Sequence, residues 1–141
     1  TDGSETADKA AVYAIGLAKQ LQASIIAMSV IDERFLITRA VSVEWSLPDV
    51  VESIDDHLRE VAAGHTREVE KRCEEAAVPS RVVIVSGHPV DEIVREAEKS
   101  KVDLIVMGSH GRSALVAAAL GSITYGVIHK DTTIPILVIR R

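Results

Sequence analysis

An apolar run that leads directly into a glycine-rich loop constrains the fold of this chain more than any other feature. Residues 102–107 read VDLIVM, and Gly108, Gly111 and Gly121-Ser122 follow with the spacing G-x2-G-x9-G-[ST]. The run is typical of a strand buried in a parallel sheet, and glycine lets a backbone approach a ligand closely. Loop amides at a helix start beyond such a strand form an anion site. The stretch predicts a phosphate-bearing ligand, in the first place a nucleotide. A strand end and a helix start without any ligand would also suit these glycines.

Apolar strands and amphipathic helices alternate along the chain. Strands are expected at 23–30, 81–86, 102–107 and 136–139. Helices are expected at 7–21, 49–78, 90–97 and 122–129. The alternation specifies an α/β fold with an open, doubly wound parallel sheet and helices on both faces. The connection over 31–49 shows no clear period, and loops of that length tend to be functional.

Composition narrows the class of protein. The length predicts one domain over residues 1–141, with a core of aliphatic side chains because aromatic residues make up only 3%. The net charge of −5 argues against nucleic-acid binding. No apolar run is long enough to span a membrane and no signal peptide is visible, so no membrane partner is expected. Cys73 is the one cysteine, which fits the reducing cytoplasm.

Several segments together resemble the ATP-binding branch of the universal stress protein family. They are the opening TDGS, then SVIDE, SGHPVDEIV, the stretch VDLIVMGSHGRSALVAAALGSIT and the closing TTIPILVIR. The complete G-x2-G-x9-G-[ST] pattern distinguishes the ATP-binding branch. The resemblance covers essentially the whole chain and implies a five-stranded parallel sheet of order 3-2-1-4-5.

The resemblance also implies a set of ligand-binding positions. Those that flank adenine and ribose, or pack on the adenine, are Thr1, Asp2 and Val30. Those around the ribose and phosphates are Met107, Gly108, His110, Gly111 and Arg112. Those that cradle the triphosphate are Gly121, Ser122, Ile123 and Thr124. Members of the family are usually homodimers joined through the last strand, here Ile136–Ile139.

The order of elements departs from the family in one respect. The segment TDGSE looks like the loop that leaves a strand, yet the first strand itself is missing before Thr1. A central strand cannot be removed without leaving two rows of buried backbone groups unpaired. We therefore expect about six to eight further, mostly apolar, residues upstream of Thr1. The alternative is that a strand from another chain fills the position.

The chemistry of the loop limits how it can hold a triphosphate. Arg112 is its one cation, so neutralisation must come mainly from backbone N–H groups, the helix start and a divalent ion, Mg²⁺ or Mn²⁺. The hydroxyls of Ser122 and Thr124 can donate to phosphate oxygens. His110, between two glycines, is expected to be exposed, either in contact with the ligand or as an ordinary surface residue. The same alternative stands for Arg112.

The leading interpretation is an ATP-binding stress-response regulator that acts as a nucleotide-dependent dimeric switch toward an unknown protein client. The chain lacks the G-x4-G-K-[ST] motif and paired zinc-ligand spacing, so no catalytic or metal-ligating residue is assigned. Two alternatives stay open: a slow ATPase that needs a partner, with at most weak hydrolysis, and a dimeric interaction module without nucleotide. The sequence does not decide between ATP, AMP, ADP and a cyclic nucleotide.

Overall fold

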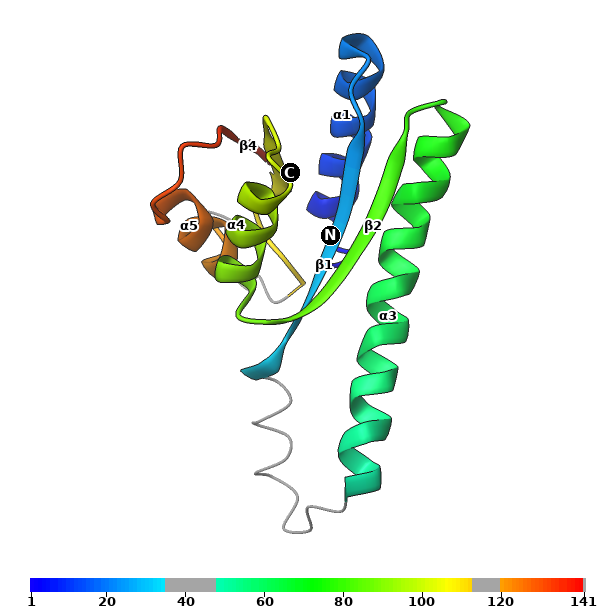
Figure 1. The fold of residues 1–141 in the computed structure, drawn as a ribbon, viewed down its shortest axis with the longest axis vertical. Coiled ribbons are helices and arrows are strands. Elements are labelled where there is room, and N and C mark those ends of the chain that lie inside the picture. The colour runs from blue at the N-terminus through cyan, green and yellow to red at the C-terminus, as the bar shows by residue number, and fades with distance from the viewer. Residues whose placement is uncertain (35–47, 113–119, 141) are drawn as a thin grey trace.

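The computed structural model describes residues 1–34, 48–112 and 120–140. In chain order its helices are α1 (Glu5–Leu21), α3 (Pro48–Glu75), α4 (Pro89–Lys99) and α5 (Ser122–His129). Its strands are β1 (Ile25–Asp32), β2 (Ser80–Gly87), β3 (Ile105–Gly108) and β4 (Ile136–Ile139) (Figure 1). The alternation of strands and helices predicted from the sequence is confirmed. Most of the predicted 31–49 connection lies outside the described residues.

The four described strands form two separate parallel sheets. β1 pairs with β2 from Ile25 opposite Ser80 to Asp32 opposite Gly87. β3 pairs with β4 over four residues, from Ile105 opposite Ile136. The single sheet expected from the sequence is therefore split in two, because no strand among the described residues lies hydrogen-bonded between β1 and β3.

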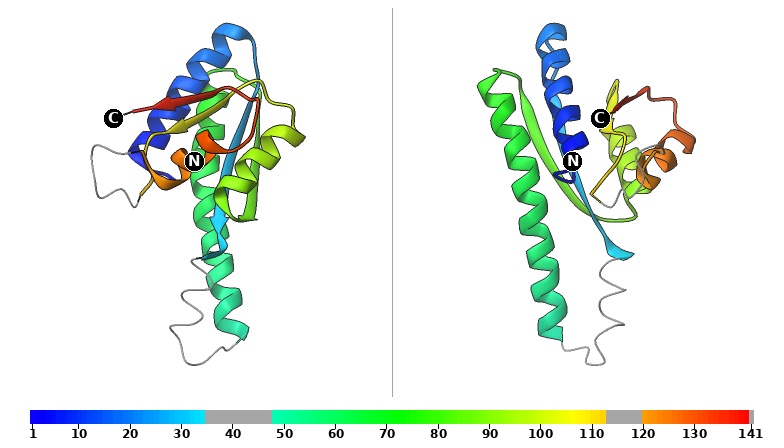
Figure 2. Two further views of the ribbon diagram at one scale, coloured as in Figure 1. Left: turned by 90° about the vertical axis from the view of Figure 1, so that its left-hand side faces the viewer. Right: turned by 180° about the vertical axis from the view of Figure 1, so that it is seen from behind.

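Helices cover the strands from two sides, and each side has its own apolar core. α1 and α3 pack on one side, whereas α4 and α5 pack together on the other (Figure 2). The first core joins α1, β1 and α3 through Ile15, Ala18, Ala27, Val69, Cys73 and Val78. The second joins α4, β3 and α5 through Val94, Ala97, Ile105 and Val127. Both cores are built from small and aliphatic side chains, as the scarcity of aromatic residues predicted.

Local backbone chemistry sets the ends of the helices. Ser4 caps α1, since its Oγ accepts the Ala7 N–H at 3.3 Å. α3 ends at Glu75, three residues before the predicted end, because Ala77 adopts a left-handed φ of 57°. Val102 belongs to the turn after α4, because its N–H donates to the Ala97 carbonyl. β3 therefore begins at Ile105, three residues later than predicted.

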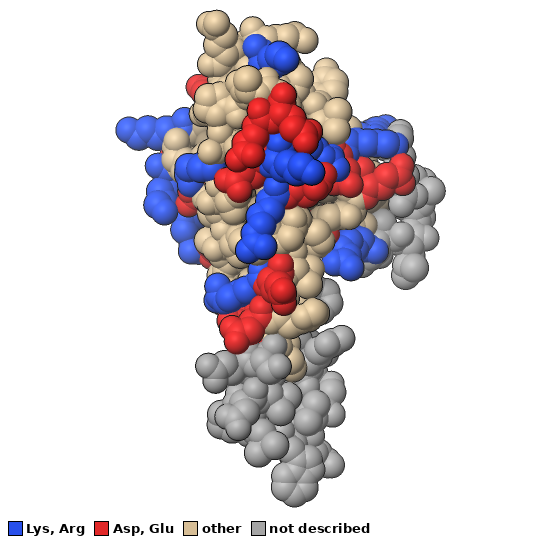
Figure 3. All heavy atoms as spheres, turned by 90° about the vertical axis from the view of Figure 1, so that its right-hand side faces the viewer, with Lys and Arg blue, Asp and Glu red and all other residues tan. Residues whose placement is uncertain are grey.

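The surface carries interspersed charges of both signs. On α3, Arg59 and Asp55 lie 2.7 Å apart, and Arg72 and Glu68 lie 3.0 Å apart, each pair one helical turn apart in sequence. Figure 3 shows this mixture of basic and acidic side chains on one face of the molecule. Among the described helices, none combines the length and apolarity needed to cross a bilayer.

Candidate functional site

The two glycine segments singled out in the sequence lie side by side. The Gly121 N–H donates to the Ser109 carbonyl oxygen at 2.8 Å, and the Ser109 N–H donates to Ile139 of β4 at 2.8 Å. A Cβ at position 121 would stand 3.3 Å from the Cα of His110. The loop after β3 and the start of α5 are therefore packed backbone to backbone, which a side chain at position 121 would disturb.

The first backbone N–H groups of α5 have no side-chain cap. Gly121 is the N-cap residue, and no side chain accepts from the first helical N–H groups in the described structure. Ser122 is exposed, whereas Thr124 is 3% exposed and its hydroxyl donates to the Gly108 carbonyl at 2.9 Å. The Ser122 hydroxyl is thus open to a ligand. The Thr124 hydroxyl proton is used within the protein to hold the end of β3.

Asp2 ties the first residues of the chain to the same loop. Its Oδ2 accepts the Arg112 N–H at 3.0 Å, and its Oδ1 accepts the Ser4 N–H at 3.0 Å. Burial raises the pKa of this carboxyl, but the hydrogen bonds from Ser4 and Arg112 outweigh burial and the pKa is lowered overall. A Cβ at Gly111 would come within 2.7 Å of Oδ2, so a larger residue there would displace the Asp2 carboxylate.

Thr1 reaches the other sheet. Its backbone nitrogen donates to the Met28 carbonyl oxygen of β1 at 2.5 Å. Val30, two residues further along β1, is half-buried, as is Met107 of β3. The segment 1–2 therefore connects the carboxyl halves of β1 and β3, which carry these two apolar side chains.

His110 is less exposed than its place between two glycines suggested. Its Nδ1 lies 2.9 Å from the Ser109 hydroxyl. Its Nε2 is buried and has no hydrogen-bond partner in the described structure. Buried polar atoms are nearly always hydrogen-bonded in native proteins. An unmatched Nε2 beside the glycine segments is therefore an atom suited to a ligand.

Two side chains that sequence reasoning did not assign to the site also contact the loop. The hydroxyls of Ser4 and Thr6 both donate to the carbonyl oxygen of His110. Ser4 is placed there by its capping position, and Thr6 lies four residues before Ala10 on the buried face of α1. That spacing is the one signal in the sequence that could have identified Thr6.

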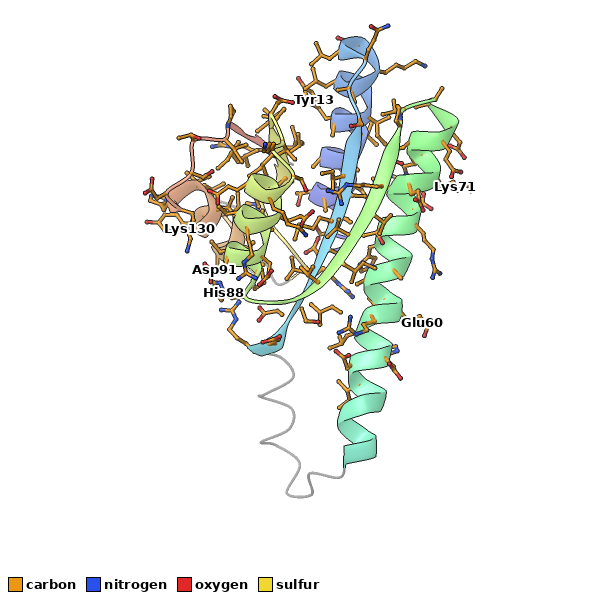
Figure 4. The ribbon with its side chains drawn as sticks, in the orientation of Figure 1. Tyr13, Glu60, Lys71, His88, Asp91 and Lys130 are labelled. Atoms are coloured by element: carbon orange, nitrogen blue, oxygen red, sulfur yellow. The ribbon has the colours of Figure 1, made fainter. Side chains whose placement is uncertain are left out.

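Other features of the described residues stand apart from this site. At the start of α4, Asp91 contacts His88 at 3.1 Å and Lys130 at 2.6 Å, and these three partly exposed side chains form a polar cluster on the surface (Figure 4). A hollow of about 340 Å³ lies at the amino ends of β1 and β2, beside Ile25 and Arg81. The glycine loop lies at the opposite edge, beyond the carboxyl end of β3, so this hollow is not part of the candidate site. No cluster of three metal-ligating side chains is found among the described residues.

Comparison with known proteins places the chain among proteins of one family. The universal stress protein family model matches residues 1–140. Universal stress protein MJ0531 of Methanocaldococcus jannaschii is 36% identical over 141 residues, covering 100% of this chain and 79% of the relative. A structure of protein MJ0577 is 33% identical, with a TM-score of 0.84 over 100% of this chain and 92% of that one. UspA of Lactobacillus plantarum is 25% identical, with a TM-score of 0.78 over 99% and 93%. A parallel α/β arrangement, a loop packed on the start of α5 and these similarities lead to one conclusion: the chain belongs to the universal stress protein family.

Proposed function

We propose that the chain binds ATP at the carboxyl ends of β1 and β3. The observation that carries the proposal is the packing of residues 108–112 against the uncapped start of α5, with Gly121 N–H bonded to Ser109. A helix start with open N–H groups attracts anions through both hydrogen bonding and its partial positive charge. The triphosphate would lie on Gly121, Ser122, Ile123 and Thr124.

The remaining ligand would extend toward the chain's first residues. Val30 and Met107 supply apolar surface for the adenine, and Thr1 and Asp2 lie between the strands that carry them. Gly108, His110, Gly111 and Arg112 would surround the ribose and phosphates. The buried Nε2 of His110 supports this assignment because a ligand atom would satisfy it.

Charge balance requires a cation in addition to the protein groups. Arg112 is exposed, and its guanidinium can reach phosphate while its N–H stays on Asp2. A bound Mg²⁺ or Mn²⁺ would supply the remaining charge, with phosphate oxygens as its main ligands. Phosphate oxygens would have to supply most of the metal ligands, because the described residues contain no cluster of three metal-ligating side chains.

We further propose that β1 and β3 belong to one sheet, completed by an extended segment between them. In the family order 3-2-1-4-5, that segment would be strand 1, and β2, β1, β3 and β4 would be strands 3, 2, 4 and 5. The Ile25 N–H donates to the Pro79 carbonyl, and the Ile105 N–H donates to the Pro135 carbonyl. Because backbone groups alternate in direction along a parallel strand, those of Met28, Val30 and Val106 face the space between the two sheets. Amide hydrogen exchange tests this: protection of Val30 and Val106 as strong as that of Ala27 supports the added strand. Fast exchange at both contradicts it.

Nucleotide binding would act through a homodimer. The half-buried strand β4 is bonded on one side to β3, and its other edge carries Ile136 and Val138 backbone groups suited to a second copy. A ligand that binds only the folded protein stabilises it by about 2.7 kcal/mol at a hundredfold excess over Kd. In this proposal, occupancy by ATP changes which protein client the dimer recognises in a stress response.

The assignment is tested by Gly121→Val, with Gly64→Ala as the matched control. The valine side chain would push against His110 and Ser109, whereas a Cβ at Gly64 meets nothing within 4 Å. We expect ATP with Mg²⁺ to raise the Tm of the wild type and of Gly64→Ala but not of Gly121→Val. An equal rise in the folded Gly121→Val variant, with folding checked by circular dichroism, would show that the triphosphate lies elsewhere.

A further inference from the structure

The carbonyl oxygen of His110 receives two hydroxyl donors from the start of α1. Ser4 Oγ lies 3.3 Å away, and Thr6 Oγ1 forms a shorter bond to the same oxygen. Thr6 is 2% exposed, so its hydroxyl is committed to this contact and shielded from water. Two side chains more than a hundred residues away in sequence therefore hold one peptide of the glycine loop.

Holding that carbonyl also sets the direction of the next N–H group. The His110 carbonyl and the Gly111 N–H belong to one planar trans peptide, in which they point in opposite directions. With the carbonyl turned to α1, the Gly111 N–H is turned away from α1. The Gly111 nitrogen lies 3.6 Å from the place of a Cβ at Gly121, and no described residue accepts its hydrogen.

Several neighbouring polar groups of the loop are already engaged. The Gly108 carbonyl accepts from Thr124 at 2.9 Å, and the Arg112 N–H donates to Asp2 at 3.0 Å. Gly108 is also pressed against α1, since a Cβ there would stand 2.7 Å from the Thr6 carbonyl carbon. The loop is thus fixed on both sides of Gly111, and the Gly111 N–H is left as an open backbone donor among the described residues.

We propose that Ser4 and Thr6 are positioning residues for the nucleotide. Their hydroxyls fix the His110–Gly111 peptide so that the Gly111 N–H is presented to an anionic phosphate oxygen, before any ligand arrives. The inference rests on the proposed ATP site and assigns the geometry of that site to the first turn of α1. A preformed donor binds more tightly because the loop loses less freedom on binding.

Thr6→Val tests the role of the buried hydroxyl, and Thr6→Ser retains it. Valine matches threonine in shape, so the change removes the hydrogen bond with little change in packing volume. We expect Thr6→Val, and more so Ser4→Ala/Thr6→Val, to weaken ATP binding about tenfold by calorimetry. Thr6→Ser should bind ATP within about twofold of the wild type. In the nucleotide-free protein, amide exchange at Gly111 should become faster in Thr6→Val but not in Thr6→Ser.

Thr66→Val separates positioning from a general loss of stability. Thr66 is fully buried in α3, and its hydroxyl donates to Ala62 of its own helix at 3.1 Å. We expect this variant to bind ATP like the wild type. Equal weakening in Thr66→Val and Thr6→Val, failure of Thr6→Ser to restore binding, or unchanged Gly111 exchange in Thr6→Val would overturn the inference. Absence of ATP binding in the wild type would instead reject the proposed function, and the exchange measurement would still decide whether the hydroxyls hold the loop.

Discussion

Gly108 stands where the first turn of α1 meets the end of β3. A Cβ at this position would lie 2.6 Å from Thr6 Oγ1 and 2.7 Å from the Thr6 carbonyl carbon, and the latter is backbone that cannot rotate away. The sequence pattern suggested that this glycine admits a ligand. The contacts show that glycine at this position is also required by the close approach of α1, which in turn fixes the loop.

At Gly108 we therefore expect alanine to destabilise the fold. Gly108→Ala should lower the free energy of unfolding by about 1–3 kcal/mol, the usual cost of overpacking. Urea denaturation measures the change. Gly64→Ala, at an exposed helical position with nothing within 4 Å of the new methyl group, should raise stability by about 0.5–1 kcal/mol. Equal effects of the two substitutions would refute the close contact with α1.

Among single residues, Glu96 is the clearest source of a pH-dependent free energy of unfolding. Bonds from the Ser100 hydroxyl at 2.7 Å and from Arg81 at 3.1 Å, helped by Lys99, lower its pKa from 4.5 to about 2. Because the folded pKa is depressed, the carboxylate stabilises the fold fully above pH 4.5, and this stabilisation is lost as the pH falls toward 2.

Glu96→Gln should show this dependence directly. At pH 7 we expect the variant to be less stable by about 1 kcal/mol, a modest value because Arg81 and Lys99 are exposed and screened by solvent. The difference from the wild type should shrink as the pH is lowered from 4.5 to 2. A constant difference across that range, measured by urea denaturation, would show that the charge of Glu96 is not responsible.

At the scale of elements, the sequence predicted which segments are strands and helices better than where they end. Apolar runs and helical periods identify the elements because burial of one face leaves a regular pattern. The predicted α5 and β4 match the structure, whereas α3 ends early at the left-handed Ala77 and β3 begins late after the turn at Val102. Such ends depend on individual backbone hydrogen bonds, which leave little trace in composition.

The candidate site was likewise predicted only in part from the sequence. The glycine spacing predicted a ligand site made by residues 108–112 and 121–124, and the structure shows that the two segments are in backbone contact through the Gly121 N–H and the Ser109 carbonyl. The hydroxyl contacts of Ser4 and Thr6 with His110 were not predicted, because they join segments more than a hundred residues apart. The buried Nε2 of His110 was missed for the same reason, since its burial comes from packing and not from its neighbours in sequence.

The outer edge of β4 allows a test of the proposed homodimer. The Ser109 N–H bonds to the Ile139 carbonyl, so the alternation along β4 turns the backbone of Val138 away from β3. Val138→Pro removes an outward N–H without breaking a bond to β3. We expect dimerisation to weaken about tenfold or more, while Val138→Ala dimerises normally. Sedimentation velocity measures this, and an unchanged dimer in the folded proline variant would place the interface elsewhere.

At the scale of the whole molecule, the first residues of the chain hold the two sheets together. Thr1 bonds to Met28 of β1, whereas Asp2 bonds to the N–H of Arg112 beyond β3. Each sheet also has its own apolar core. A nucleotide at the carboxyl ends of β1 and β3 would touch both halves and stabilise their relative placement.

The most direct measurement is a calorimetric titration of nucleotide-free protein with ATP and Mg²⁺. The proposed site predicts saturable binding with one nucleotide per chain in the micromolar range or tighter, a Kd of about 1 μM corresponding to about −8 kcal/mol. Binding heat should disappear in Gly121→Val and persist in Gly64→Ala. Absence of saturable heat with the folded wild type would contradict the central claim, and would favour a protein that acts through its interfaces without nucleotide.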